Sequence, residues 1–303
     1  MDLRVLKYFL TIAQEQNITH AAKKLHMAQP PLSRQLQLLE DELNTPLFLR
    51  GKKKLELTPE GRILKERAEQ ILQLVDKTVI EVSETAEGFS GTVYIGATET
   101  ISSTMLPRWI AGFREQYPKV NYNVWSGNSD DVIRQLEENL IDFAIVREPY
   151  SKVNLNGIKI NKENWCALIS ADSKIGRMPG DTIHLSDMDG CDIIVPSISY
   201  RKKEIEGWFE SAGCTVNIFC EYSPIINSVY LVEQNVGIAI LPSSVKNVIS
   251  NRNLILKKIV EPEITSNVVI LTNKSHILSQ TAGKFLDFIQ ENAQSGFEEM
   301  MLD

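Results

Sequence analysis

The sequence predicts a multidomain α+β chain, on three observations. Helical periodicity occupies roughly the first 58 residues, a long unbroken helical pattern follows from residue 59, and short β-rich runs then alternate with amphipathic helices. A chain of 303 residues with 43% apolar and 23% charged residues has the length and composition of two or three globular domains. We therefore expect domains over residues 1–58, 59–88 and 89–303.

The segment Gln29–Glu42 has the pattern of a DNA-recognition helix. Pro30 and Pro31 fix its start, because the first backbone N–H groups of a helix have no partners that proline could remove. Leucines form one apolar stripe at intervals of three and four residues, at Leu32, Leu36, Leu39 and Leu43. The polar side chains off this stripe suit base edges and phosphates. An ordinary amphipathic surface helix is the alternative for this segment alone.

Two shorter helical patterns and a tight turn precede this segment. The first covers Leu3–Ala13, and the second covers His20–Leu25 with Thr19 as its expected N-cap. Residues 26–28 are too few for anything but a turn. Helix, helix, turn and helix is the order of a helix-turn-helix, which lays its last helix in the major groove.

A pair of short β-rich runs follows, over residues 45–50 and 55–57. Two such strands around a basic turn predict a wing. Lys52, Lys53 and Lys54 in the turn are placed to meet phosphate or a minor groove. A solvated run of charge is the alternative for these lysines.

Charge is distributed unevenly along the chain. The net charge is −7 and the isoelectric point is about 5.3, which by themselves argue against nucleic acid. Residues 1–67, however, contain 12 Lys and Arg against 8 Asp and Glu, so the rest of the chain carries −11. A basic end on an acidic body favours double-stranded DNA as a partner of the N-terminal end only.

The N-terminal motifs resemble the winged helix-turn-helix of LysR-type transcriptional regulators. The matching residues are Ala21-Ala22, Leu25, Gln29–Ser33, Leu39-Glu40, Leu43, Pro46-Leu47-Phe48, Arg50 and Leu57–Gly61. This resemblance and the patterns above give the candidate DNA-binding residues Thr19, Gln29, Pro30, Pro31, Ser33, Arg34, Gln37, Arg50, Lys52, Lys53 and Lys54. The arginine usual in the wing of this family is a lysine here.

A long helix is expected from Thr58, as N-cap, and Pro59 to about Glu87. Apolar residues recur along it at Leu64, Ala68, Ile71, Val75, Val79, Val82 and Ala86. Charged residues lie between them, which is typical of a coiled-coil seam, although packing on the same chain is the alternative. The resemblance implies a homodimer through this linker helix, and a homotetramer is also possible in the family.

The last 215 residues predict a mostly parallel, doubly wound α/β sheet in two lobes. Strands are expected at Thr92–Gly96, Val120–Ser126, Asp142–Val146, Cys166–Ile169, Ile193–Val195, Val216–Cys220, Gly237–Leu241 and Val268–Thr272, and helices at Leu106–Tyr117, Asp130–Asn139, Lys203–Ala212, Ile225–Glu233 and Ala282–Ile289. Lobe 1 covers about 91–161 and 267–293, and lobe 2 about 162–266. The resemblance implies an effector-binding domain similar to type-2 periplasmic binding proteins, whose lobes close on a small molecule.

Ligands of open α/β sheets bind beyond the carboxyl ends of the strands, where helices begin. The loop Thr98–Thr104 and those around residues 126–129, 147–149 and 196–200 meet this condition. They and the resemblance give the candidate effector-binding residues Thr98, Thr100, Ser102, Ser103, Asn128, Arg147, Ser197 and Ser199. A hydroxyl at a helix start is more often a cap. Glu99 would oppose a carboxylate ligand.

A redox trigger is an alternative, because Cys214 and Cys220 lie six residues apart around a predicted strand, and peroxide sensors of this family use two cysteines in this lobe. The apolar neighbours Val216, Ile218 and Phe219 favour burial of inert thiols instead. No pair among the four cysteines has the spacing of a metal or redox motif.

An enzyme or a transport binding protein with an incidental DNA-like head is the least favoured reading. The chain has no GxSxG, GxxxxGK[ST] or HExxH motif, and its four histidines are scattered, so we expect no catalytic residues, metal or cofactor. No apolar run approaches the ~20 residues of a membrane span, and no signal peptide is recognised. The expected location is the cytoplasm.

Overall fold

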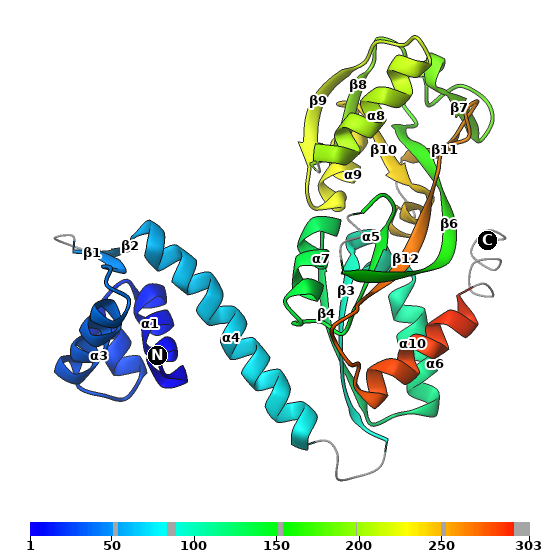
Figure 1. The fold of residues 1–303 in the computed structure, drawn as a ribbon. Coiled ribbons are helices and arrows are strands. Elements are labelled where there is room, and N and C mark those ends of the chain that lie inside the picture. The colour runs from blue at the N-terminus through cyan, green and yellow to red at the C-terminus, as the bar shows by residue number, and fades with distance from the viewer. Residues whose placement is uncertain (51–53, 84–88, 151–153, 198, 250–252, 294–303) are drawn as a thin grey trace. The chain divides into compact units, whose positions relative to one another are not determined.

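The computed structural model describes residues 1–50, 54–83, 89–150, 154–197, 199–249 and 253–293. They form two compact units, Met1–Thr85 and Ala86–Asp303 (Figure 1).

Three helices build the core of the N-terminal unit: α1 (Leu3–Glu15), α2 (Ile18–Lys24) and α3 (Gln29–Glu42). The core contains Phe9, Ile12, Ala21, Ala22, Leu32, Leu36, Leu39, Leu47 and Phe48. The helix-turn-helix order is confirmed, and α3 has the predicted bounds. Two details were wrong. Asn17 rather than Thr19 caps α2, since its side chain accepts from Thr19 N and His20 N. Leu43 ends α3 and is 38% exposed instead of joining the apolar stripe.

The wing consists of β1 (Phe48–Arg50) and β2 (Leu55–Leu57), which pair antiparallel. Helix α4 (Pro59–Ser83) follows, and Thr58 is its N-cap as expected, because Thr58 Oγ1 accepts from Gly61 N at 2.9 Å. A Cβ at Gly61 would lie 2.1 Å from Leu47 O, so only glycine allows the start of α4 to lie so close to the wing. The expected end of α4 near Glu87 lies outside the described residues.

A ten-stranded mixed sheet runs through the described part of the C-terminal unit, in the order β4-β3-β5-β12-β6-β10-β8-β9, with β11 paired to β6 and β7 paired to β11. The strands are β3 Gly91–Thr98, β4 Val120–Gly127, β5 Phe143–Arg147, β6 Leu155–Ser170, β7 Thr182–His184, β8 Asp192–Pro196, β9 Asn217–Tyr222, β10 Ile238–Pro242, β11 Leu254–Val260 and β12 Thr265–Asn273. A mostly parallel sheet was the wrong expectation. Strand β6 leaves lobe 1 and β12 returns to it, so these two pair antiparallel, and β10 and β11 also pair antiparallel with β6.

Helices cover both faces of the sheet in each lobe. In lobe 1, α6 (Leu106–Gln116) and α10 (Gln280–Asn292) pack on one face and α7 (Ser129–Glu137) on the other. In lobe 2, α8 (Ser199–Ser211) and α9 (Ile225–Glu233) take opposite faces. Alternate strand residues supply the two cores, as the period of two requires. The doubly wound, two-lobed expectation is confirmed.

Several elements were not predicted. They are α5 (Glu99–Thr104), the 3-10 helices η2 (Leu185–Met188) and η3 (Ser243–Val248), β7, β11 and the first half of β6. The expected loop over residues 98–104 is helical over Glu99–Thr104, and its hydroxyls bond back along this helix: Ser103 Oγ donates to Glu99 O, and Thr104 Oγ1 to Thr100 O.

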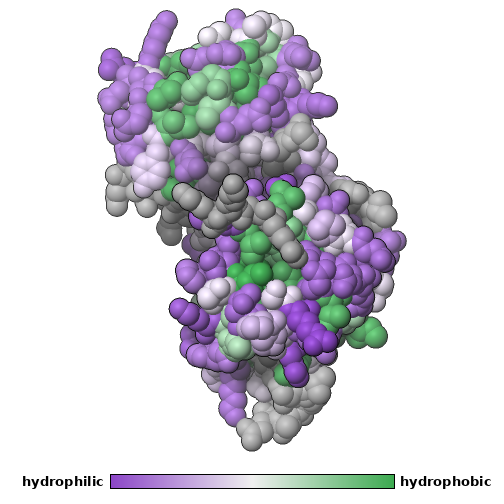
Figure 2. Space-filling view, turned by 90° about the vertical axis from the view of Figure 1, so that its left-hand side faces the viewer, coloured by the Kyte–Doolittle hydropathy of each residue, from purple (hydrophilic) through white to green (hydrophobic). Residues whose placement is uncertain are grey.

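Figure 2 shows hydrophobic residues gathered in patches among hydrophilic ones on the surface. Large apolar side chains exposed in lobe 2 include Phe219 and Val236. Within the described ranges, no helix combines the length and the apolar character that crossing a membrane requires.

Candidate nucleic-acid interface and ligand cavity

The outer face of α3 presents the predicted DNA-binding side chains to solvent. Gln29, Arg34 and Gln37 are exposed, as are both prolines, and Ser33 is half-buried. Gln37 Nε2 donates to Asp41 Oδ1 at 2.9 Å, which holds this amide along the helix. One helix therefore displays donors and acceptors of the kind that bond base edges in the major groove.

The other predicted DNA-binding residues belong to α2 and the wing. Thr19 is exposed in the first turn of α2. Arg50 is the last residue of β1, where it pairs with Leu55, and Lys54 is exposed before β2. Lys52 and Lys53 lie outside the described residues.

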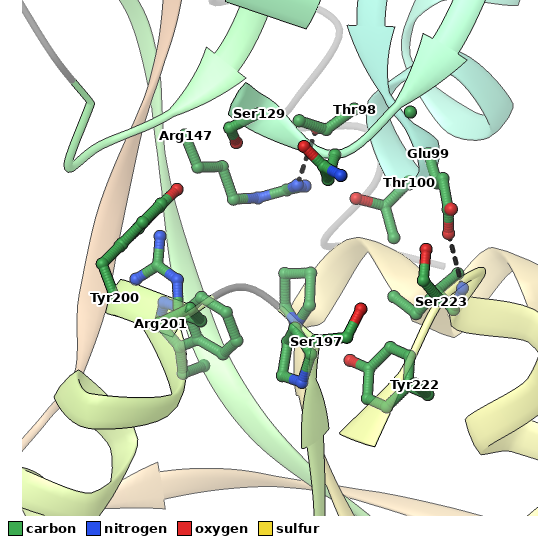
Figure 3. Close-up of a pocket in the computed structure, with 16 residues that line it drawn as sticks. Thr98, Glu99, Thr100, Ser129, Arg147, Ser197, Tyr200, Arg201, Tyr222 and Ser223 are labelled. Carbon is green, nitrogen blue, oxygen red and sulfur yellow. Dashed lines mark hydrogen bonds between the residues drawn. The ribbon is translucent and has the colours of Figure 1, made fainter. Parts of the chain in front are cut away.

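A cavity of about 90 Å³ lies where the two lobes of the C-terminal unit meet. It is lined by Thr98, Glu99, Thr100, Gly127, Asn128, Ser129, Arg147, Trp165, Pro196, Ser197, Tyr200, Arg201, Tyr222, Ser223, Ile225 and Pro242. Figure 3 shows Arg147, Tyr200 and Arg201 on one side of it and Glu99, Tyr222 and Ser223 on the other. The cavity thus joins polar groups of opposite charge to aromatic and proline surface.

Arg147 reaches the cavity from the end of β5 in lobe 1. Its Nε donates to Glu163 Oε2 at 2.7 Å, and its Nη1 to Thr98 Oγ1 at 3.2 Å. Its Nη2 donates to Ser244 Oγ in lobe 2 at 3.3 Å, while Ser244 N donates to Glu163 Oε1 at 2.7 Å. Both side chains of the Arg147–Glu163 pair are buried. This network fixes the guanidinium and bridges the lobes.

Arg201 reaches the same cavity from the first turn of α8 in lobe 2. It lies 4.7 Å above the Trp165 ring and 5.5 Å from the Tyr200 ring, and forms an ion pair with Glu204. Its Nη2 donates to Glu148 O of lobe 1 at 2.9 Å. Burial lowers the pKa of Arg201, although Glu204 acts in the opposite direction. Burial thus makes its positive charge costly, and an anion bound beside it would offset part of that cost.

Glu99 and Tyr222 define the opposite side of the cavity. Glu99 is the first residue of α5 in lobe 1, and its Oε2 accepts from Ile225 N, the first residue of α9 in lobe 2. A carboxylate at a helix N-terminus is favourable. Tyr222 ends β9 and is 6% exposed, and its hydroxyl has no hydrogen-bond partner among the described residues.

Of the predicted effector-binding residues, the structure brings five to the cavity, namely Thr98, Thr100, Asn128, Arg147 and Ser197. Ser102 and Ser103 donate instead to Glu99 O and are absent from the lining. Ser199 begins α8, and its side chain lies outside the described part. Asn128 also caps α7 by accepting from Asp131 N.

Sequence reasoning missed Trp165, Arg201 and Tyr222 as lining residues. Arg201 did leave a signal. It precedes Ile205 by four residues and Phe209 by eight, so it lies on the buried stripe of α8, where a charged residue needs a special reason.

The four cysteines are free. Cys214 packs against the lobe 2 core on the α8 side and Cys220 against the core on the α9 side, so the two thiols contact cores on opposite faces of the sheet. Burial raises the pKa of Cys166 to about 12, which keeps it a thiol. No group of three His, Cys, Asp or Glu side chains suited to a metal occurs among the residues that the structure describes.

The fold and these two sites define a class of protein: a winged helix-turn-helix joined by a long helix to a two-lobed α/β ligand-binding unit. Residues 3–62 match the family described as bacterial regulatory helix-turn-helix protein, lysR family, and residues 86–294 match the LysR substrate binding domain. The chain belongs to the LysR family, whose members are DNA-binding transcriptional regulators and not enzymes.

Similar proteins cover nearly the whole chain. The HTH-type transcriptional regulator BsdA of Bacillus subtilis (strain 168) is 35% identical over 291 residues, which are 95% of this chain and 99% of that protein. BenM of Acinetobacter baylyi is 27% identical over 305 residues, 99% of each chain. The crystal structure of CbnR, a LysR family transcriptional regulator, has a TM-score of 0.82 at 23% identity and covers 97% of this chain and 99% of that one. The overall fold is therefore that of full-length LysR regulators.

Proposed function

We propose that this regulator couples binding of a small organic anion between its lobes to the way in which α3 contacts an operator. The proposal of an anionic effector rests on one observation: Arg147 and Arg201, one from each lobe, line the same cavity. An anion between them would interact differently with open and closed lobes, and only such a difference can shift a conformational equilibrium.

We assign a separate function to each of the three parts of the chain. Residues 1–58 would bind DNA through Thr19, Gln29, Pro30, Pro31, Ser33, Arg34, Gln37 and the wing. Residues 59–88 would pair with the same helix of a second copy, and Val79, 62% exposed, lies on the expected seam. Residues 89–303 would bind the effector. Because its partner is DNA, we place the protein in the cytoplasm.

The test is footprinting of the full-length protein on the DNA flanking its own gene, with and without a panel of small organic acids. We expect a footprint whose extent changes with at least one acid. The variant Arg201→Gln should bind the same DNA but need roughly 10 to 100 times more of that acid, since a hydrogen bond to a charged group is lost. Arg177→Gln, an exposed arginine of lobe 2, is the charge-matched control.

Two results would contradict the proposal. An acid response of Arg201→Gln at the wild-type concentration would exclude the cavity as the effector site. A footprint that no acid alters, with acids also failing to bind the protein in calorimetry, would exclude an anionic effector.

A further inference from the structure

The cavity carries a donor close enough to Arg147 and Arg201 for both charges to act on it, and a negative charge on the side away from these arginines. The donor is the Tyr222 hydroxyl, which points into the cavity (Figure 3). It makes no hydrogen bond of standard geometry within the described ranges, and the Ser228 hydroxyl that acts on it donates to Ile225 O. The charge is the carboxylate of Glu99.

A buried hydroxyl without a partner costs free energy, so proteins rarely retain one without a use for it. Burial first, and then the Glu99 carboxylate, raise the pKa of Tyr222, so the hydroxyl keeps its proton and acts as a donor at neutral pH. Removing it should therefore not harm the empty protein. A ligand acceptor in the cavity would satisfy it.

Glu99 restricts what the far end of the same ligand can be. Its Oε2 is occupied by Ile225 N, whereas its Oε1 has no partner among the residues described, so part of the charge still faces the cavity. A second anionic group placed here would meet a like charge in a partly buried site, which is unfavourable. A neutral or hydrogen-bond-donating end would not.

We infer that Tyr222 and Glu99 select a monoanionic effector: Tyr222 donates to its acidic group, and Glu99 rejects a second acidic group. This inference rests on the proposed function, because it presumes that the cavity takes a small organic anion. It adds two specificity-determining residues and narrows the ligand to acids with one negative charge.

The experiment is calorimetric titration of the full-length protein with matched acids, butyrate against succinate and benzoate against terephthalate, up to about 10 mM because fragments this small bind weakly. Wild type should prefer the monoacid of at least one pair by roughly tenfold or more. Glu99→Gln keeps an oxygen for Ile225 N and should remove most of that preference by tightening the diacid. Glu115→Gln, exposed on α6, is its control.

The Tyr222→Phe variant distinguishes a role in ligand binding from a role in stability. It should weaken the monoacid roughly threefold to tenfold, while thermal unfolding without ligand occurs at an equal or higher temperature. Tyr230→Phe, exposed on α9, controls for the loss of a tyrosine hydroxyl.

Failure of the inference and failure of the proposed function look different. Equal binding of monoacid and diacid, unchanged by Glu99→Gln, would overturn the monoanion selection while leaving an anion site that Arg201→Gln still weakens. A Tyr222→Phe variant that unfolds at lower temperature and binds acids normally would overturn the role of Tyr222. If none of the four acids binds, both the anionic effector and the selection are contradicted.

Discussion

The DNA-recognition face of α3 and the cavity of the C-terminal unit differ in how far apart their residues lie in the sequence and in how deeply they are buried. The candidate residues of α3 lie within nine positions, Gln29 to Gln37, and most point into solvent. The cavity residues come from positions 98 to 242 and are largely buried, and hydrogen bonds such as Arg147 to Thr98 and Ile225 N to Glu99 hold some of them in place. The outer face of α3 can take DNA contacts without moving the core, whereas a small-molecule site must hold buried charges in place before its ligand arrives.

This difference predicts where substitutions act on stability and where they act only on binding. Buried charges that lose a partner leave the other charge uncompensated. Exposed polar side chains away from caps usually change stability by less than about 0.5 kcal/mol. The two sites should therefore separate cleanly when folding and binding are measured together.

The largest effect is expected at Glu163, whose side chain is 1% exposed and bonds both Arg147 and Ser244 N. Glu163→Ala leaves a buried guanidinium unpaired and should lower the free energy of unfolding of the C-terminal unit by about 3–5 kcal/mol. Urea denaturation followed by tryptophan fluorescence measures this, because all four tryptophans lie in that unit.

Glu210→Ala, at an exposed position on α8, is the matched control and should leave the transition unchanged. If Glu163→Ala unfolds at the wild-type urea concentration, the buried pair contributes no more than a surface pair. The contrast between the two sites would then be lost.

The next effect is expected at Arg34, which is exposed on α3. Arg34→Ala should weaken operator binding by about 1–3 kcal/mol, roughly tenfold to a hundredfold, without shifting the urea transition. Gel shift at fixed salt measures the affinity, and Arg177→Ala controls for the lost charge. An Arg34→Ala protein that binds the operator as tightly as wild type would remove this side chain from the interface.

The same contrast explains what the sequence could predict. The bounds of α3 follow from Pro30, Pro31 and the leucine spacing, which are local signals. Thr98, Asn128 and Arg147 were found because ligands bind beyond strand ends, a rule that needs only the order of elements. Trp165 and Tyr222 were not found, because they lie on strands and have the sequence pattern of core residues.

The remaining errors of the sequence-based prediction arose where contacts between residues distant in the sequence determine the structure. Nothing local shows that β6 extends over 16 residues and pairs with strands of both lobes, because its first half is mostly exposed whereas its second half is almost continuously buried. Helix α5 was predicted as a loop since its threonines and serines favour caps and turns, yet packing of Ile101 into the lobe 1 core keeps it helical.

The smallest effect on stability is expected at an exposed ion pair of the N-terminal unit. Lys24 Nζ lies 2.8 Å from Glu15 Oε1 on the surface of the N-terminal unit, and this hydrogen bond and charge lower the pKa of Glu15 below its ordinary value of 4.5. The folded state therefore gains stability above pH 4.5 and loses it as the pH falls through the lowered value. In an NMR titration, Lys24→Met should return the pKa of Glu15 toward 4.5, while operator affinity at neutral pH changes little. A titration of Glu15 near 4.5 in the wild type would show that solvent already screens this pair completely.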